Sequence, residues 1–198
     1  MPNLIVIAGC NGSGKSTFAQ SLLPDGLNSF DFDKIFLEYY RNLSDSELRE
    51  EMARNLASDD FKKSIELAIK TKSDFCYETN LDDNPLYWPR YFKSKGYVVS
   101  IVFFCLSSQD IARQRVEERT EFKGHYVDNK TIDYKWREGY KNLNSYFNFF
   151  DNLLILDNSR HKKIYTNILQ MENGSIELLS ESVPAYFKHR LPNIYELL

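Results

Sequence analysis

A glycine-rich segment near the start of the chain constrains the fold more than any other feature. Residues 9–16 read Gly-Cys-Asn-Gly-Ser-Gly-Lys-Ser and match the pattern G-x-x-x-x-G-K-[ST] in full. The apolar residues 4–8 before it predict a buried strand, and residues 16–23 after it have the pattern of a short helix. A strand, a glycine-rich turn and a helix in this order are typical of a loop that binds phosphate through backbone N–H groups. We therefore predict an α/β fold that begins with a phosphate-binding loop (P-loop).

Each residue type in this loop has a chemical role. Gly9, Gly12 and Gly14 permit backbone angles that let several N–H groups face one anion. We expect Lys15 to reach the β- and γ-phosphates of a nucleoside triphosphate, and the hydroxyl of Ser16 to bind Mg²⁺. The prediction is that ATP or GTP binds with Mg²⁺ on Gly9, Asn11, Gly12, Ser13, Gly14, Lys15, Ser16 and Thr17.

The rest of the chain alternates apolar runs with charged stretches of helical length. Buried strands that alternate with helices predict a mainly parallel sheet in a three-layer sandwich, the nucleotide-kinase-like form of the P-loop NTPase fold. Ser44 and Glu47 have the spacing of a capping box and predict the start of a long helix. We expect further strands at residues 29–32, 74–77, 97–106 and 153–156, and helices at residues 44–71, 85–95, 109–121 and within 128–150.

The last part of the chain has a different pattern. Residues 164–171 and 175–179 flank Asn173-Gly174, and Asn-Gly is a strong hairpin signal. We expect a small antiparallel hairpin and then a short C-terminal segment. Because no repeat, low-complexity tract or linker interrupts the sequence, we predict one domain over residues 1–198, with a lid region at about residues 109–140.

Composition argues against two other classes of protein. A formal net charge of -3 and a pI of about 5.7 give no support for a general nucleic-acid or membrane-surface binder. No apolar run approaches the roughly 18 residues that span a bilayer, and the first residues carry no positive region of a signal peptide. The three cysteines, Cys10, Cys76 and Cys105, predict reduced and mostly buried thiols. We therefore expect a cytoplasmic protein.

The absence of two motifs narrows the class of nucleotide-binding protein to which the chain can belong. The chain has no Asn-Lys-x-Asp motif for reading guanine and no Leu-Ser-Gly-Gly signature of transporter-type ATPases. A short chain without a second domain favours a small kinase with ATP as the phosphoryl donor. Such an enzyme also needs an acceptor hydroxyl held in line, a carboxylate to deprotonate it, and cations for the transferred phosphoryl group.

Acidic residues follow the expected strands, where ligands bind in parallel sheets. Asp33 follows the second expected strand, and Glu78 and Thr79 follow the third. Asp33 is the candidate base, and Asp31 competes for that role but lies farther from the expected strand end.

Two arginines on the helix near residues 109–121 are candidate phosphate ligands. Arg115 and Arg119 are four residues apart and share one helix face, and guanidinium groups bind phosphate bidentately. Gly124 and His125 follow as the hinge of a closing lid. A solvated helix whose arginines pair with neighbouring glutamates explains the same spacing without a function.

In combination these elements resemble the zeta-toxin-like P-loop kinases. The similarity runs from about residue 4 to residue 160. It rests on residues 9–17, Asp33, Glu78-Thr79-Asn80-Leu81, Arg115-Val116-x-x-Arg119, Gly124-His125-x-Val127, Ile132 and Asp157-Asn158-Ser159.

The resemblance implies roles for five residues. Asp33 would activate the acceptor hydroxyl, Glu78 and Thr79 would help to hold the acceptor, and Arg115 and Arg119 would contact phosphates from the lid. The best-known members phosphorylate UDP-N-acetylglucosamine and are held inactive by a small antitoxin that obstructs ATP binding. A small-molecule acceptor and an antitoxin-like protein inhibitor are therefore implied here.

The lid departs from the family pattern at three positions. Lys123 replaces a glycine, Asp128 replaces a proline, and Lys135 replaces an arginine. These changes leave the acceptor open. The alternatives are a kinase of nucleic-acid 5′ ends or of another metabolite, and an ATP-gated module that docks a partner on the aromatic residues 140–150. Helical periodicity favours core packing over docking for those aromatics.

Overall fold

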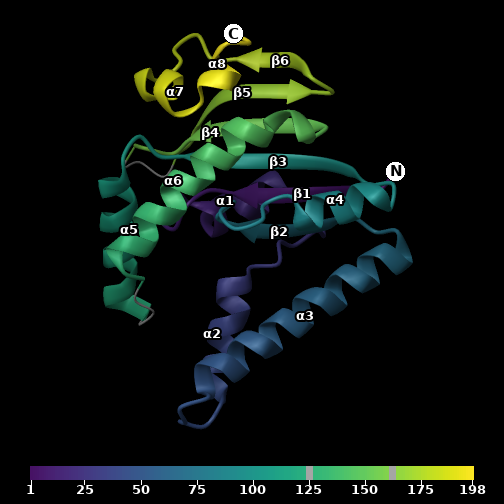
Figure 1. Ribbon diagram of the computed structural model, residues 1–198, viewed down its shortest axis with the longest axis vertical. Coiled ribbons are helices and arrows are strands. Elements are labelled where there is room, and N and C mark those ends of the chain that lie inside the picture. The colour runs from purple at the N-terminus through teal and green to yellow at the C-terminus, as the bar shows by residue number, and fades with distance from the viewer. Residues whose placement is uncertain (124–126, 161–163) are drawn as a thin grey trace.

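The computed structural model describes residues 1–123, 127–160 and 164–198, and its centre is a six-stranded sheet (Figure 1). The strand order is β2-β1-β3-β4-β5-β6, in which the first four strands are parallel and the last two antiparallel. This confirms the predicted α/β fold with a mainly parallel sheet. The strands are β1 (Asn3–Ala8), β2 (Phe75–Thr79), β3 (Val98–Cys105), β4 (Asn152–Asp157), β5 (Thr166–Glu172) and β6 (Ser175–Leu179).

Helices cover both faces of the sheet (Figure 1). Consecutive strand residues point to opposite faces, so Ile101 and Phe103 join one apolar cluster while Val102 and Phe104 join the other. The helices that pack on these faces are α1 (Lys15–Leu22), α4 (Tyr87–Ser94), α5 (Gln109–Lys123), α6 (Asn129–Tyr146), the short 3₁₀ helix η1 (Phe147–Phe149), α7 (Ala185–Arg190) and α8 (Pro192–Tyr195). None of the helices in the described chain is long and apolar enough to cross a membrane.

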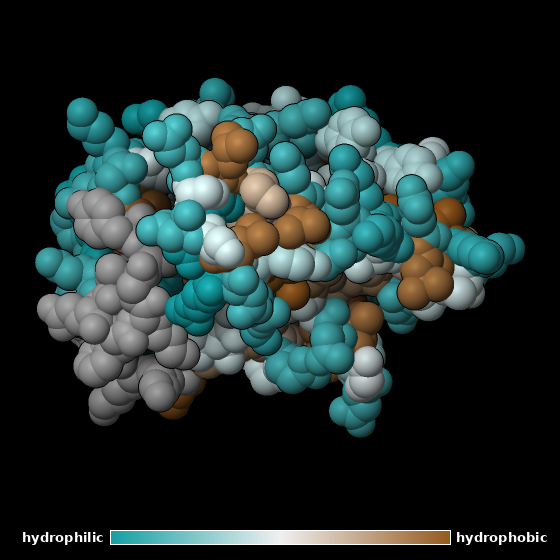
Figure 2. Space-filling model, turned by 90° about the horizontal axis from the view of Figure 1, so that it is seen from below, coloured by the Kyte–Doolittle hydropathy of each residue, from teal (hydrophilic) through white to brown (hydrophobic). Residues whose placement is uncertain are grey.

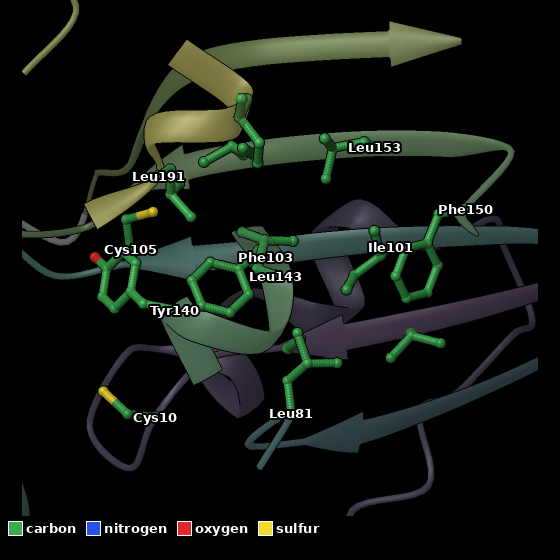
Figure 3. Packing of buried hydrophobic residues seen from close by; sticks show 14 of the residues in the cluster. Cys10, Leu81, Ile101, Phe103, Cys105, Tyr140, Leu143, Phe150, Leu153 and Leu191 are labelled. Atoms are coloured by element: carbon green, nitrogen blue, oxygen red, sulfur yellow. The ribbon is translucent and has the colours of Figure 1, made fainter. Parts of the chain in front are cut away.

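Aromatic residues near the end of α6 belong to the larger cluster. Tyr140 and Phe150 are 4% and 6% exposed, and Figure 3 shows both beside Ile101, Phe103 and neighbouring residues. Core packing is therefore the role of these two residues, and they do not offer a docking surface. The three cysteines are buried and free, as the sequence predicts.

Two helices form an arm that leaves the sheet beside β2 (Figure 1). They are α2 (Phe32–Asn42) and α3 (Arg49–Thr71). Helix α2 and the first half of α3 pack on a small cluster around Phe36, Ala53 and Ala57, whereas Ile65 in the second half of α3 belongs to the large cluster of the sheet. Seen from below, the surface is mainly hydrophilic with apolar side chains among the polar ones (Figure 2).

The structure corrects the expected elements in this region. The strand expected at residues 29–32 is reduced to one bridge between Phe30 and Tyr77, and α2 begins at Phe32. The helix starts there because the carboxylate of Asp31 accepts a hydrogen bond from the backbone N–H of Lys34 and caps it. Asp33 therefore lies in the first turn of a helix and not at a strand end.

The long helix also starts later than its pattern predicts. It begins at Arg49 instead of Ser44, and Leu48 at its N-cap makes no side-chain cap, so the capping box does not form. The C-terminal hairpin is as expected, with β5 and β6 antiparallel around the turn at Asn173 and Gly174.

Candidate active site

The glycine-rich loop joins β1 to α1, as the motif predicts. Gly9, Gly12 and Gly14 have φ angles of +140°, +78° and +103°. A Cβ at Gly9 would lie 2.8 Å from the carbonyl oxygen of Phe104, and one at Gly12 would lie 2.8 Å from that of Ala112. Backbone angles and close neighbours both require glycine here, so the loop keeps an open backbone surface toward a ligand.

Lys15 folds over this loop. Its Nζ donates to the carbonyl oxygens of Gly9 at 2.7 Å and Cys10 at 3.2 Å, and to Oδ1 of Asn80 at 3.3 Å. Burial lowers the pKa of Lys15, and the nearby carboxylates of Glu78 and Asp33 oppose that shift. The ammonium group is thus held at the point where the loop, β2 and the start of α2 meet.

Ser16 lies between two carboxylates. Its Oγ is 2.9 Å from Oδ2 of Asp31 and 2.7 Å from Oε2 of Glu78. The second oxygen of Glu78 accepts a hydrogen bond from the hydroxyl of Ser29 at 2.9 Å. Burial raises the pKa of Glu78 and the charge of Asp31 adds to this, while the hydrogen bond from Ser16 opposes it.

These oxygen atoms fit a Mg²⁺ ion. One hydroxyl proton serves only one of the two carboxylates, so Asp31 and Glu78 retain unbalanced negative charge beside Ser16. Mg²⁺ prefers hard oxygen ligands and takes one or two carboxylates together with water and substrate phosphates. Within the described residues no group of three or more His, Cys, Asp or Glu side chains gathers to hold a metal, so phosphate oxygens would have to complete this site.

Asp31 and Asp33 have different surroundings. Asp31 is committed to Ser16 and to the cap of α2. The exposed carboxylate of Asp33 lines the same cavity but accepts no hydrogen bond and forms no ion pair with any residue that the structure describes. Of the two, Asp33 is the one free to bind a ligand.

The arginines of α5 divide into two groups. Arg113 forms ion pairs with Asp133 of α6 and Asp110, so it joins two helices. Arg115 reaches the loop, with its guanidinium 3.4 Å from the carbonyl oxygen of Gly12, and Arg119 lines the cavity. The proposed hinge residues Gly124 and His125 lie outside the described residues.

Most of the predicted site residues line one cavity of about 890 Å³. Of those predicted, Gly9 and Ser13 belong to the loop but do not line the cavity, and the buried Ser13 hydroxyl has no hydrogen-bond partner among the described residues. Thr79 lines the cavity, and its hydroxyl accepts from the backbone N–H of Leu81 at 3.1 Å. The predicted residues that line it are Asn11, Gly12, Gly14, Lys15, Ser16, Thr17, Asp33, Glu78, Thr79, Arg115 and Arg119.

The residues of the site that sequence reasoning missed include Asn80, Asp82, Asn158 and Arg160. Asn80 accepts from Lys15, Asp82 and Arg160 line the cavity, and the Nδ2 of Asn158 donates to the carbonyl oxygen of Ser13 at 2.8 Å. Asn80 and Asn158 stood in the family pattern, but nothing in their spacing indicated contact with the loop.

Fold and site together define a P-loop protein of the kinase class. A family model described as Zeta toxin matches residues 1–170, so the chain belongs to the zeta toxin family. Comparison with curated proteins gives no match.

Solved structures with the same fold include three of special interest. The PezAT toxin–antitoxin system of Streptococcus pneumoniae matches with a TM-score of 0.62 and 13% identity, over 100% of this chain and 87% of that one. The AvrRxo1-ORF1:AvrRxo1-ORF2 complex matches with a TM-score of 0.72 and 12% identity, over 96% and 63%. The Pnkp1/Rnl/Hen1 RNA repair complex matches with a TM-score of 0.55 and 22% identity, over 76% and 46%. The chain thus spans less than two thirds of the last two proteins.

Proposed function

We propose that this protein is an ATP-dependent kinase that transfers the γ-phosphate to a hydroxyl group of a small molecule. The observation that carries this proposal is the free carboxylate of Asp33 in the same cavity as the glycine-rich loop. A general base must be within reach of the proton it removes and must not be committed elsewhere. Membership in the zeta toxin family supports the same reaction, and so does the AvrRxo1 complex with ATP.

The proposed step uses groups on both sides of the loop. Asp33 takes the proton of the acceptor hydroxyl, whose oxygen forms a bond to the γ-phosphorus as the bond to the bridging oxygen breaks and ADP leaves. Lys15, Arg115 and Arg119 balance the negative charge on the transferred group. Glu78 and Thr79 position the acceptor, and Glu78 also faces Ser16.

Mg²⁺ would be held by Ser16 with Asp31 and Glu78 close to it. When bound, it supplies charge neutralisation for the phosphate oxygens. Asp31 keeps α2 capped and so fixes the direction from which Asp33 approaches the cavity.

The test is the substitution Asp33→Asn. Loss of a general base lowers kcat by about 10²- to 10⁴-fold, while ATP affinity is expected to stay within about twofold of the parent, because nucleotide binding rests on the loop. Labelled ATP with a broad set of hydroxyl acceptors measures transfer, and calorimetry measures ATP binding, with Lys15→Ala as the blank. Undiminished transfer by Asp33→Asn would rule out its role as the base.

Asp31→Asn is the matched variant. Asparagine also caps helices, so α2 should remain intact while the negative charge beside Ser16 is lost. We expect a higher Mg²⁺ requirement and a kcat at saturating Mg²⁺ close to that of the parent, whereas Asp33→Asn should keep the Mg²⁺ requirement and lose kcat. If the two variants behave alike, the separate roles of these carboxylates are wrong.

Two further proposals concern partners. An antitoxin-like protein inhibitor is supported by the likeness to the PezAT toxin–antitoxin system, and co-expression and co-purification with candidate small proteins test it. A 5′-hydroxyl oligonucleotide is the second acceptor class, supported by the fold of the RNA repair complex.

The cytoplasmic location stays a prediction from the sequence.

A further inference from the structure

The loop that follows β2 passes between the cavity and helix α6. Its residues Asn80 and Asp82 line the cavity, and Oδ1 of Asn80 accepts a hydrogen bond from Lys15 at 3.3 Å. On its other side the loop lies against α6, where a Cβ at Gly139 would be 2.8 Å from the carbonyl oxygen of Asn80. The path of this loop therefore depends on α6 and sets which side chains enter the cavity.

Within the loop, Leu81 has a backbone conformation that a leucine rarely adopts. Its φ angle is +59°, in the left-handed region, and its side chain is 1% exposed in the large apolar cluster, where Figure 3 shows it. Its backbone N–H donates to the hydroxyl of Thr79 at 3.1 Å. Such a conformation persists only where its surroundings hold it in place, so the turn needs firm contacts on its outer side.

One side chain of α6 supplies these contacts. The Nδ2 atom of Asn142 donates to the carbonyl oxygen of Leu81 at 2.9 Å and to that of Asp82 at 2.6 Å. Because both partners are acceptors, the amide must present its NH₂ group to them. The two carbonyl groups belong to the peptide units before and after Asp82. Each peptide unit is planar, so holding both units fixes the direction in which the Asp82 side chain leaves the backbone.

We infer that Asn142 is a positioning residue for the proposed transfer reaction, and that it acts by keeping the Asp82 carboxylate directed into the cavity. This inference rests on the proposed kinase function. Asn142 does not itself line the cavity, so it acts on a bound molecule through Asp82. Asp82 lies shortly after Glu78 and Thr79, for which we propose contact with the acceptor, and a carboxylate accepts hydrogen bonds from hydroxyl groups.

The experiment is a double-mutant cycle between Asn142 and Asp82. N-acetylglucosamine, UDP-N-acetylglucosamine and a 5′-hydroxyl oligonucleotide are assayed as acceptors with labelled ATP and Mg²⁺, and the one that the parent phosphorylates best is used to measure kcat and KM. Asn142→Ala should lower kcat/KM for this acceptor about tenfold, the size of one lost hydrogen-bonded contact. The affinity for ATP should stay within about twofold, because the glycine-rich loop is unchanged and distant substitutions act independently.

The double variant separates positioning from a general structural role. Once Asp82→Ala is in place, Asn142→Ala should lower kcat/KM by no more than about twofold further, because residues that act through one another are not additive. Additive losses in the double variant would overturn the inference.

Asn144→Ala is the matched control on the same helix. The Oδ1 of Asn144 accepts from the backbone N–H of Asn193 at 2.9 Å, and neither residue lines the cavity. This variant should lower the Tm as Asn142→Ala does, but it should leave kcat/KM for the acceptor unchanged. Equal losses of kcat/KM in the two variants would mean that Asn142 acts only through stability.

A crystal structure of the Asn142→Ala variant tests the inference without any acceptor. We expect the Asp82 carboxylate to leave the cavity wall, while Lys15 keeps its hydrogen bonds to Gly9 and Cys10. An Asp82 side chain that keeps its parental direction would overturn the inference and leave the kinase function intact. Failure of the parent to phosphorylate any acceptor would count against the kinase function instead, and the variant structure would still decide whether Asn142 directs Asp82.

Discussion

Asn158 illustrates how one side chain from a distant part of the chain fixes the phosphate-binding loop. It is 4% exposed, and its Nδ2 donates to the carbonyl oxygen of Ser13 at 2.8 Å. A Cβ at Gly14 would lie only 2.4 Å from the same nitrogen. The amide therefore fills the space beside Gly14 and fixes the orientation of the Ser13 carbonyl group.

We expect Asn158→Ala to weaken ATP binding by about 5- to 30-fold, because a buried hydrogen bond of about 1–2 kcal/mol is lost. Isothermal titration with ATP and Mg²⁺ measures it. Asn152→Ala is the control, since Asn152 lies at the other end of β4 and bonds Ser100 at 2.9 Å. Equal effects of both variants would mean that Asn158 acts only through general stability.

At the scale of elements, helix α6 is capped at its N-terminus and packs closely against the loop that follows β2. Asp128 caps the helix, with its carboxylate accepting from the backbone N–H of Thr131 at 3.0 Å and from the hydroxyl of the same residue at 2.6 Å. Farther along, Gly139 is buried against the loop that follows β2: a Cβ there would lie 2.8 Å from the carbonyl oxygen of Asn80. Because Asn80 also accepts from Lys15, the position of α6 is coupled to the site.

Gly139→Ala should destabilise the protein, although replacing glycine by alanine in an exposed helix normally stabilises the helix by roughly 1 kcal/mol. The added methyl group displaces Asn80, so we expect a lower melting temperature and weaker ATP binding together. Ser145→Ala, at an exposed position of the same helix, is expected to leave both unchanged. A more stable Gly139→Ala variant would show that the loop at Asn80 can move to accept the methyl group without a loss of stability.

The cap of α6 should make stability depend on pH. Hydrogen bonds from the side chain and then the backbone of Thr131 lower the pKa of Asp128 below its ordinary 3.8. The stabilisation is therefore complete above that pH and is lost as pH falls through the lowered pKa of the folded state. Asp128→Ala should lower Tm by about 2–4 °C near neutral pH.

Thermal melts from about pH 7 to pH 3 separate charge from capping. Asp128→Asn keeps a capping side chain without a titrating group, so the advantage of the parent over this variant should vanish at the acidic end. A constant difference between the two across the whole range would exclude linkage at Asp128.

Sequence reasoning succeeded for the central strands and the hairpin turn, and it failed for helix α2 of the arm. The strands β1, β3 and β4 are continuous apolar runs, and the turn at Asn173 and Gly174 has a local signal, so both were predicted. Helix α2 was missed because aromatic residues after position 29 favoured a strand. Its apolar residues Phe32, Ile35, Phe36 and Tyr39 recur at helical spacing and, with the Asp31 cap, carried the missing signal.

The contacts that complete the site had no local signal at all. Lys15 meets Asn80 across 65 positions, and Ser13 meets Asn158 across 145. Such pairs depend on the order of strands in the sheet, which the alternation of apolar and charged segments does not specify. The glycine-rich loop was predictable because its chemistry lies within one continuous segment.

At the scale of the whole molecule, the core extends past the matched family region. The family match covers residues 1–170, but Phe187, Leu191 and Ile194 of the last two helices are fully buried in the same apolar cluster as β3 and α6. Figure 3 shows Leu191 near Cys105 and Tyr140. These helices therefore belong to the folding unit that carries the site.

Phe187→Ala should lower the free energy of unfolding by about 3–5 kcal/mol, as for other fully buried aromatic residues. Urea unfolding measures it, and Tyr195→Ala, at a 37% exposed position of α8, is the control. A loss below about 1 kcal/mol, within the range of surface substitutions, would mean that the C-terminal helices dock only loosely.

The separate small cluster inside the α2–α3 arm has an evolutionary consequence. Phe36, Ala53 and Ala57 hold the outer part of this arm together, while Ile65 joins the core of the sheet. The first turn of the arm carries Asp33, for which we propose the role of base. Substitutions in this outer part can therefore accumulate without disturbing the packing around the glycine-rich loop. Descendants of one ancestral chain could in this way acquire new substrates while inheriting an unaltered nucleotide cradle.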